Sequence, residues 1–164
     1  MEVNFVKIKD YCTKNLRVFS VCLGQNEKTE FDKFYSRNDE FDATHIEEMD
    51  ILYSTLEAFC FEGARRYKFV QETYSYYLPV VYNEIKDENI DDFGIRLYCI
   101  YLRDDLIILL NGDKKTKHKP EDCKNVKDHF KRAEKIGHKI LKACEQGDLD
   151  LNKENPFEDY TIDI

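Results

Sequence analysis

Two apolar segments joined by a two-acid turn constrain the fold of this chain more than any other feature. They read IRLYCIYL (residues 95–102) and LIILL (residues 106–110), with Arg103, Asp104 and Asp105 between them. β-Rich runs on either side of a tight turn are typical of an antiparallel hairpin. The second run leads into NGDKKTKHKP, which contains four lysines and a histidine. We therefore expect a hairpin within a small sheet and a basic rim just past its second strand.

Four further segments carry a recognisable pattern. Residues 16–23 alternate in the β-rich run LRVFSVCL and predict a strand that ends at Gly24. Phe31, Phe34 and Tyr35 lie at helical spacing and predict a first helix. A second helix is expected over residues 44–63, with a capping box at its start, Gly63 as its stop, and a core stripe formed by Ile46, Met49, Leu52, Tyr53, Leu56, Phe59 and Cys60. A last helix begins near Pro120, with its apolar face on Val126, Phe130, Ala133, Ile140, Leu141 and Cys144, and ends at Gly147.

A strand near residues 67–72 completes the expected elements, and Pro79 argues against a central strand in the tyrosine-rich stretch that follows it. We therefore predict an α+β fold: a small antiparallel sheet of about four strands, with two N-terminal helices and a C-terminal helix packed against it. This domain covers residues 1–147. Residues 148–164 form an acidic tail without a clear period, which we expect to be extended over the surface or disordered.

Composition excludes several classes of protein. The 164 residues carry a net charge of −8, which argues against unspecific nucleic-acid binding. The charge is segregated, because residues 111–142 hold eleven Lys and Arg against five Asp and Glu, whereas the tail holds six acids and one lysine. Six widely spaced cysteines without a CxxC pair indicate reduced core thiols in a cytoplasmic protein. The N-terminal residues contain no long apolar run, so we expect neither a signal peptide nor a membrane span.

Most catalytic patterns are missing from the sequence. The spacing of Cys123, His129, His138 and Cys144 matches no zinc motif, so we expect no metal, and no cofactor is indicated. NGDKKTK lacks the spacing of a phosphate-binding loop. Nothing in the sequence pairs a cysteine with a histidine as nucleophile and base.

The basic rim is the one surviving candidate site, and it consists of Lys114, Lys115, Lys117, His118 and Lys119. On the adjacent strand Arg96 and Tyr98 share a face, which we interpret as a solvent-facing platform. Aromatic and guanidinium groups flanked by lysines suit RNA, because bases stack on them and phosphates are neutralised. The alternative is that the rim is a solvated loop and that Arg96 pairs with a surface carboxylate.

The run GIRLYCIYLRDDLIILLNGDKKTK, followed by a helix with HFKRAEKIGHKI, resembles the RelE/HigB superfamily of bacterial toxin–antitoxin systems. The similarity covers residues 63–142, and the preceding order of a strand and two helices also fits that family. It implies a cytoplasmic, metal-independent endoribonuclease that cuts mRNA, in some cases on the ribosome. Its partner would be a cognate antitoxin, expected to be of the helix-turn-helix type. The sequence leaves the oligomeric state open.

The resemblance also implies roles for individual residues. Arg96 matches the strand arginine of the family, and Lys114 and Lys115 match its basic positions after the last strand, so these three are the expected catalytic residues. Arg65 and Arg66 are expected phosphate binders, with Tyr98, Lys117, His118 and Lys119 as further RNA-binding residues. The chemistry is attack of a ribose 2′-OH on the adjacent phosphate, for which closely packed cations can supply a lysine of depressed pKa.

Two features leave other functions open. The chain is longer and more acidic than most such toxins, which favours a catalytically inactive RelE-fold module that binds a protein, or a gyrase-inhibiting relative of the same fold. The sign of its charge also suggests that the acidic tail folds back over the basic rim and inhibits it.

Overall fold

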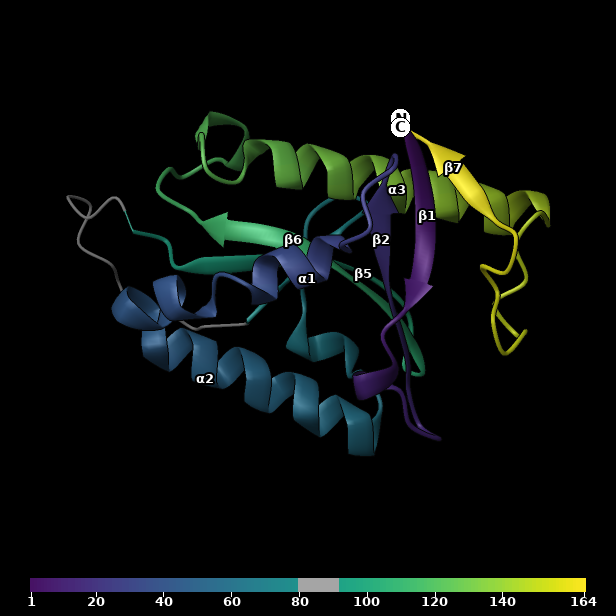
Figure 1. The fold of residues 1–164 in the computed structure, drawn as a ribbon, viewed down its shortest axis with the longest axis horizontal. Helices are drawn as coiled ribbons and strands as arrows, with labels where there is room; N and C mark the ends of the chain where they lie inside the picture. The colour runs from purple at the N-terminus through teal and green to yellow at the C-terminus, as the bar shows by residue number, and fades with distance from the viewer. Residues whose placement is uncertain (80–91) are drawn as a thin grey trace.

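A computed structural model describes residues 1–79 and 92–164. Its centre is a seven-stranded mixed sheet in the order β3-β4-β5-β6-β2-β1-β7. Helices α1 (Glu30–Tyr35) and α2 (Asn38–Glu62) cover one face, and α3 (Lys127–Gln146) covers the other (Figure 1). The fold is therefore α+β, but the expectation of a small antiparallel sheet of about four strands behind two N-terminal helices is wrong. Two strands precede the first α-helix, and β2 (Arg17–Leu23) runs parallel to β6 (Leu106–Lys114).

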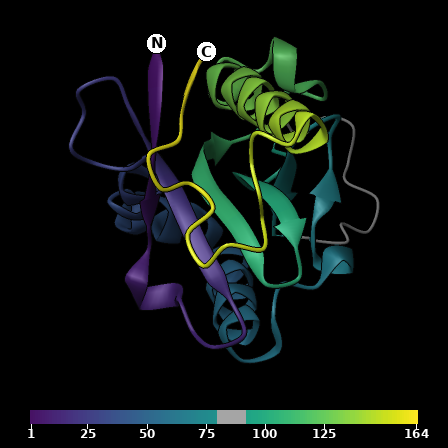
Figure 2. The same ribbon diagram turned by 90° about the vertical axis from the view of Figure 1, so that its right-hand side faces the viewer.

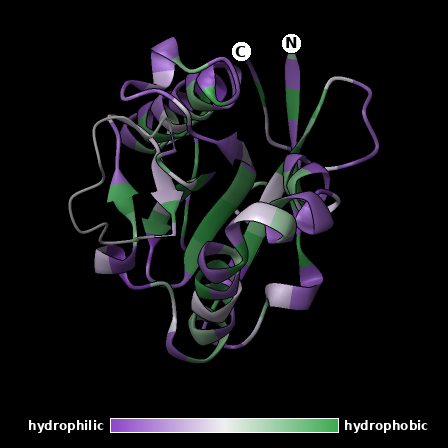
Figure 3. Ribbon diagram, turned by 90° about the vertical axis from the view of Figure 1, so that its left-hand side faces the viewer, coloured by the Kyte–Doolittle hydropathy of each residue, from purple (hydrophilic) through white to green (hydrophobic). Residues whose placement is uncertain are grey.

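The predicted hairpin is present as β5 (Ile95–Arg103) and β6, which pair antiparallel around the turn at Asp104 and Asp105. Both strands are buried on both faces, because helices cover the sheet from either side. Side chains of β5 alternate between the two cores: Ile95, Leu97 and Cys99 face α2, whereas Tyr98 and Ile100 face α3. Figure 3 shows these central strands as the most hydrophobic part of the molecule.

The long helix α2 begins at Asn38, earlier than the capping box at Thr44 predicted. The backbone departs from helical geometry at His45, so the expected start coincides with a kink. Gly63 ends the helix as predicted, with a φ of 81° that other residues rarely adopt. Met49, Leu52, Leu56 and Phe59 form the buried stripe, but Ile46, which we placed in it, is 56% exposed.

Helix α3 ends against Gly147, as predicted, but it begins at Lys127, because the residues near Pro120 form only a short 3₁₀ turn at Pro120–Asp122. It packs Ala133, Ile136 and Ile140 against the sheet. The predicted face is correct for most positions, whereas Leu141 is 47% exposed.

The residues of the acidic tail are part of the fold. Strand β7 (Thr161–Asp163) pairs with β1 (Glu2–Lys7), a strand that the sequence pattern did not reveal. Leu149, Phe157 and Ile162 are buried in the core on the α3 side of the sheet. The two ends of the chain lie side by side, with the Met1 amino group donating to the Ile164 carbonyl at 3.0 Å (Figure 2).

The strand expected near residues 67–72 is present as the short strand β3 (Val70–Gln71). It pairs with a second short strand, β4 (Tyr76–Leu78), and together they extend the sheet. β4 lies between β3 and β5, so the expectation that Pro79 excludes an internal strand is wrong. The strand ends at Leu78, one residue before the proline, and no backbone donor is missing from its pairing. The later part of the tyrosine-rich stretch lies outside the described residues.

Candidate active site

Arg96 and Tyr98 share one face of β5, as predicted, but this face is not open to solvent. Tyr98 is fully buried, and its ring centroid lies 6.0 Å from that of Phe130 in α3. Arg96 is only 9% exposed. The apolar stripe of α3 requires an apolar surface to cover, and this face of the sheet provides it. The predicted solvent-facing platform is therefore wrong.

Among the described residues, Arg96 contacts an aromatic side chain and forms no ion pair with a carboxylate. Its guanidinium carbon lies 4.3 Å from the ring centroid of Tyr77, a cation–π contact, and its Nη1 donates to the Ile95 carbonyl at 3.2 Å. Its Nε is buried without a hydrogen-bond partner among the described residues, and so is the Tyr98 hydroxyl. Buried donors of this kind are rare in folded proteins, because each costs about 1–3 kcal/mol. Two of them on one strand face make this part of β5 a candidate site.

Lys115 lies near Arg96 because the antiparallel pairing of β5 and β6 continues past the ends of both strands. The Lys115 amide donates to the Gly94 carbonyl at 2.9 Å, and the Phe93 amide donates to the Lys115 carbonyl at 2.8 Å. The ammonium group lies 5.7 Å from the Phe93 ring centroid. Burial, followed by the charge of Arg96, lowers the pKa of the Lys115 ammonium.

Glu72, in the turn between β3 and β4, completes the group. Burial raises the pKa of its carboxyl group, although the charges of Lys115 and Arg96 oppose this shift. The environment thus moves the pKa values of Lys115 and Glu72 toward neutrality from opposite sides, which is typical of acid–base pairs in active sites. We call Glu72, Arg96, Tyr98 and Lys115 the Arg96 cluster.

Cys123 lies beside this cluster under the loop that follows β6. Burial opposes ionisation of its thiol, but hydrogen bonds from Thr116 and from neighbouring backbone amides lower the pKa of Cys123 below its usual value. The Thr116 amide donates to Sγ at 3.3 Å. Neither Glu72 nor Cys123 was selected from the sequence, because neither belongs to a motif and only the folded chain brings them to Lys115.

The other expected site residues divide into two groups. Lys114 is the last residue of β6 and half-buried, while Lys117, His118 and Lys119 lie exposed in the following loop. The His118 ring is 5.8 Å from that of Phe93, which places it near Lys115. Arg65 and Arg66 lie elsewhere. Arg65 follows Ala64, whose amide donates to the Asp104 carbonyl at the turn of the hairpin, and Arg66 stacks on Tyr76 on the α2 face of the sheet. They do not join the Arg96 cluster.

The acidic tail does not cover the basic rim. Arg17, beside the start of β6, donates from its Nη2 to the Leu151 carbonyl at 3.1 Å, and Arg103 donates to Asn152 at 2.7 Å. At about 3.3 Å per residue, this end of β6 is roughly 30 Å from Lys115. The hypothesis of a self-inhibiting tail over the rim is therefore wrong.

A second buried group of charges joins the two helical layers. The side chain of Glu30 is 3% exposed and contacts Lys33 at 2.6 Å and Arg132 at 3.4 Å, and the Asn111 amide donates to it at 3.3 Å. Nearby, burial lowers the pKa of His129, and the charges of Arg37 and Arg132 add to this shift. Apart from His129, the charged side chains of this second group form ion pairs with one another, which is typical of a structural network.

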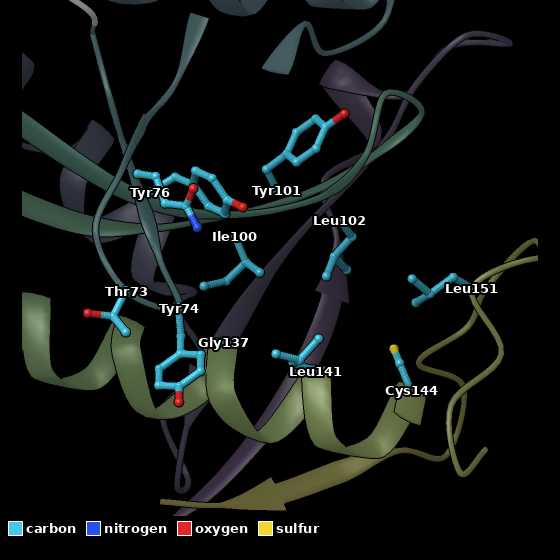
Figure 4. Close-up of a pocket in the computed structure, with 11 residues that line it drawn as sticks. Thr73, Tyr74, Tyr76, Ile100, Tyr101, Leu102, Gly137, Leu141, Cys144 and Leu151 are labelled. Atoms are coloured by element: carbon cyan, nitrogen blue, oxygen red, sulfur yellow. The ribbon is translucent and has the colours of Figure 1, made fainter. Parts of the chain in front are cut away.

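Two surface hollows are relevant to binding. One, of about 240 Å³, lies between β5 and α3 and includes Ile100, Leu102, Leu141, Cys144 and Leu151 in its wall (Figure 4). The other, of about 340 Å³, lies beside α2 and is bordered by Arg65 and Lys68. In the part of the chain that the structure describes, no three His, Cys, Asp or Glu side chains could hold a metal ion together.

Comparison with protein-family models, with curated proteins and with solved structures finds no match. None of the described helices combines the length and the apolar composition that a bilayer span requires. All six cysteines are free.

Proposed function

We propose that the chain is a RelE/HigB-like toxin: a cytoplasmic, metal-independent endoribonuclease that acts on mRNA and is neutralised by a cognate antitoxin. The observation that carries this proposal is the Arg96 cluster. Arg96 and Lys115, which the resemblance marks as catalytic, lie together with an acid on one side of the sheet. Two buried donors of this cluster lack a partner among the described residues. A phosphate group is the ligand that such donors suit best.

The cluster supplies each group that cleavage of RNA without a metal requires. The neutral amine of Lys115 accepts the proton of the ribose 2′-OH, whose oxygen forms a bond to the adjacent phosphorus. The guanidinium of Arg96 neutralises the charge that develops on the phosphate oxygens. The protonated carboxyl of Glu72 donates to the 5′-oxygen as its bond to phosphorus breaks. The products are a 2′,3′-cyclic phosphate and a 5′-hydroxyl end.

The order of elements supports the same proposal. A strand, two helices, three antiparallel strands and a C-terminal helix occur as β2, α1, α2, β4 to β6 and α3. The resemblance implies this order for the strand, the two helices, the hairpin of β5 and β6, and the last helix. Strands β1, β3 and β7 extend the sheet at its two edges and leave the order of this inner part unchanged.

The test is induced expression in a bacterial host, combined with mapping of RNA ends in a cell-free translation reaction. We expect growth arrest and cyclic-phosphate ends that persist in EDTA. Lys115→Met keeps the aliphatic stem and should lower cleavage by about 10²–10⁴-fold, the usual loss for a general base. Lys139→Met, at an exposed position of α3, is the matched control and should cleave like the wild type. Cleavage that Lys115→Met and Arg96→Gln leave unchanged would contradict the assignment of the site.

The alternative is a RelE-fold module that binds a protein and does not cleave RNA. The contact between Arg96 and Tyr77 favours it, because the guanidinium is already covered by a ring of the same chain. In that case the folded wild-type chain yields no cyclic-phosphate ends at any concentration. Lys115→Met would then change neither growth nor RNA.

A further inference from the structure

Helix α2 carries an unusual concentration of negative charge. Its 25 residues include eight Asp and Glu and no Lys or Arg, so its net charge of −8 equals that of the whole chain. Seven of the acids are exposed and form no ion pair with any described residue: Asp39, Glu40, Asp42, Glu47, Asp50, Glu57 and Glu62. Glu62 lies in the last turn, where the helix dipole disfavours an acid. The helix dipole favours Asp39 and Glu40 in the first turn, but it does not explain the acids in the middle of the helix and in its last turn.

The outward side of α2 is also apolar. At about 100° per residue, Ile51, Ser54, Ala58 and Phe61 fall within about 80° of one another, on the side away from the buried stripe. Ile51 is 42% exposed and Phe61 is 73% exposed. We call these four residues, with Glu47, Asp50, Glu57 and Glu62 around them, the α2 outer surface. A helix with a second apolar stripe facing solvent is typical of a binding surface.

A hollow runs along this surface and gives it a shape. Ser54, Thr55 and Ala58 are small, and they leave a space of about 340 Å³ between α2 and the segment that bears Arg65 and Lys68. Small side chains allow a second helix to approach closely. Asp50 and Glu62 border the hollow on the helix side, and Arg65 and Lys68 border it on the opposite side, where the Lys68 ammonium lies 5.5 Å from the Tyr67 ring centroid.

We infer that the α2 outer surface binds a lysine- and arginine-rich amphipathic helix of a partner protein. Charge complementarity selects this occupant. A second copy of the chain would bring two helices of net charge −8 together, and nucleic acids and anionic membranes would be repelled. The partner's apolar side chains fill the hollow beside Ala58, and its basic side chains pair with Asp50, Glu57 and Glu62. The surface lies across the sheet from the Arg96 cluster, so this inference does not depend on the proposed function.

The probe is a synthetic 21-residue helical peptide with leucine on one face and lysine on the other, titrated into the full chain by fluorescence anisotropy. Its twin replaces every lysine with glutamate. Ala58→Trp fills the hollow from an exposed position and should weaken binding of the leucine–lysine peptide by about tenfold or more, as truncation of an interface centre does. The glutamate twin should not bind.

Charge is tested by two triple variants that lose the same three negative charges. Asp50→Asn with Glu57→Gln and Glu62→Gln should weaken binding about tenfold at low salt and flatten its salt dependence. Glu145→Gln with Glu154→Gln and Glu158→Gln, all exposed and outside α2, should change it by less than about twofold. Equal effects of the two triples, no effect of Ala58→Trp, binding of the glutamate twin, or a dimer that Ala58→Trp dissociates would each overturn the inference.

Discussion

Glu30 in α1 and Arg132 in α3 form an ion pair at 3.4 Å, although their helices cover opposite faces of the sheet. The parallel pairing of β2 and β6 explains how they meet. It covers only Arg17–Phe19 against Leu106–Ile108, and beyond these residues the described strands are not paired with each other. Asn111 of β6 donates to the same carboxylate at 3.3 Å. The two helical layers are thus connected by charge where the two strands separate.

Loss of the Glu30 carboxylate should strongly destabilise the protein. In Glu30→Ala, Lys33, Arg132 and Asn111 lose their shared acceptor in a buried site, and breaking such a group costs about 3–5 kcal/mol. Urea unfolding at pH 7 measures the change. Glu27→Ala, at an exposed position, is the control and should change stability by less than about 0.5 kcal/mol. A similar loss in both variants would mean that the ion cluster contributes nothing specific.

Stability should fall on acidification because of His129. Burial and the charges of Arg37 and Arg132 lower its pKa in the folded state, so the folded chain binds fewer protons than the unfolded chain below about pH 6.5. The contribution is present above that pH and is lost as pH falls toward the lowered value, by at most about 1.4 kcal/mol per pH unit.

The measurement is the free energy of unfolding of wild type and His129→Gln between pH 7.5 and pH 5.5. The wild type should lose more stability over this range than the variant. His138→Gln, at an exposed position of the same helix, should retain the slope of the wild type. Parallel curves for wild type and His129→Gln would contradict the assignment.

The C-terminal residues should stabilise the fold as a core element does. Phe157 is 3% exposed, stacks on Phe5 with the ring centroids 4.4 Å apart, and meets Phe19 edge to face at 5.0 Å. Phe157→Ala should cost about 3–5 kcal/mol, the usual loss for a buried Phe. Phe61→Ala removes the same group from an exposed position and should cost less than about 0.5 kcal/mol. Denaturant unfolding compares the two, and equal losses would mean that the tail is not packed in solution.

Periodicity predicted the elements that have a strong pattern of their own. The hairpin of β5 and β6, the strand β2, and the ends of α2 and α3 at Gly63 and Gly147 follow directly from the sequence. Strand β7 was not predicted because it has only three residues, and β1 was not predicted because Glu2, Asn4 and Lys7 interrupt its apolar residues; β1 is held by pairing with both β2 and β7. The parallel contact of β2 with β6 is likewise a long-range event that local pattern cannot specify.

The candidate site, too, could be predicted only where a local sequence pattern marks it. The motif that contains Arg96 and Lys115 is visible in the sequence, and the continued pairing at Gly94 brings these two residues together. Exposure could not be predicted, because it depends on which sheet face α3 covers. Glu72 reaches the cluster from a turn between two very short strands, and nothing in its local sequence distinguishes it from the other acids of this chain.

Gly137 in α3 should not tolerate a side chain. A Cβ there would lie 2.1 Å from the Tyr74 carbonyl oxygen, a backbone atom that cannot move aside easily. Replacement of glycine by alanine inside a helix normally stabilises by about 1 kcal/mol. In Gly137→Ala the overlap should reverse the sign, with a net loss of about 1–3 kcal/mol. Thermal unfolding tests this, with Lys139→Ala as the exposed control in the same helix; stabilisation by Gly137→Ala would contradict the close approach.

The pH dependence of RNA cleavage should reveal Lys115 and Glu72 separately, given the proposed function. The active form needs Lys115 neutral and Glu72 protonated. Because the pKa of Lys115 is lowered from the alkaline side and that of Glu72 is raised from the acid side, the rate should be nearly constant between the two values. Glu72→Gln removes one of the two opposing titrations. Its cleavage should be slower, yet rise about tenfold per pH unit up to the pKa of Lys115.

Single-turnover cleavage of a short RNA between pH 5 and pH 10 measures both profiles, with Glu145→Gln as control. A flat profile for Glu72→Gln would exclude the two residues as an acid–base pair.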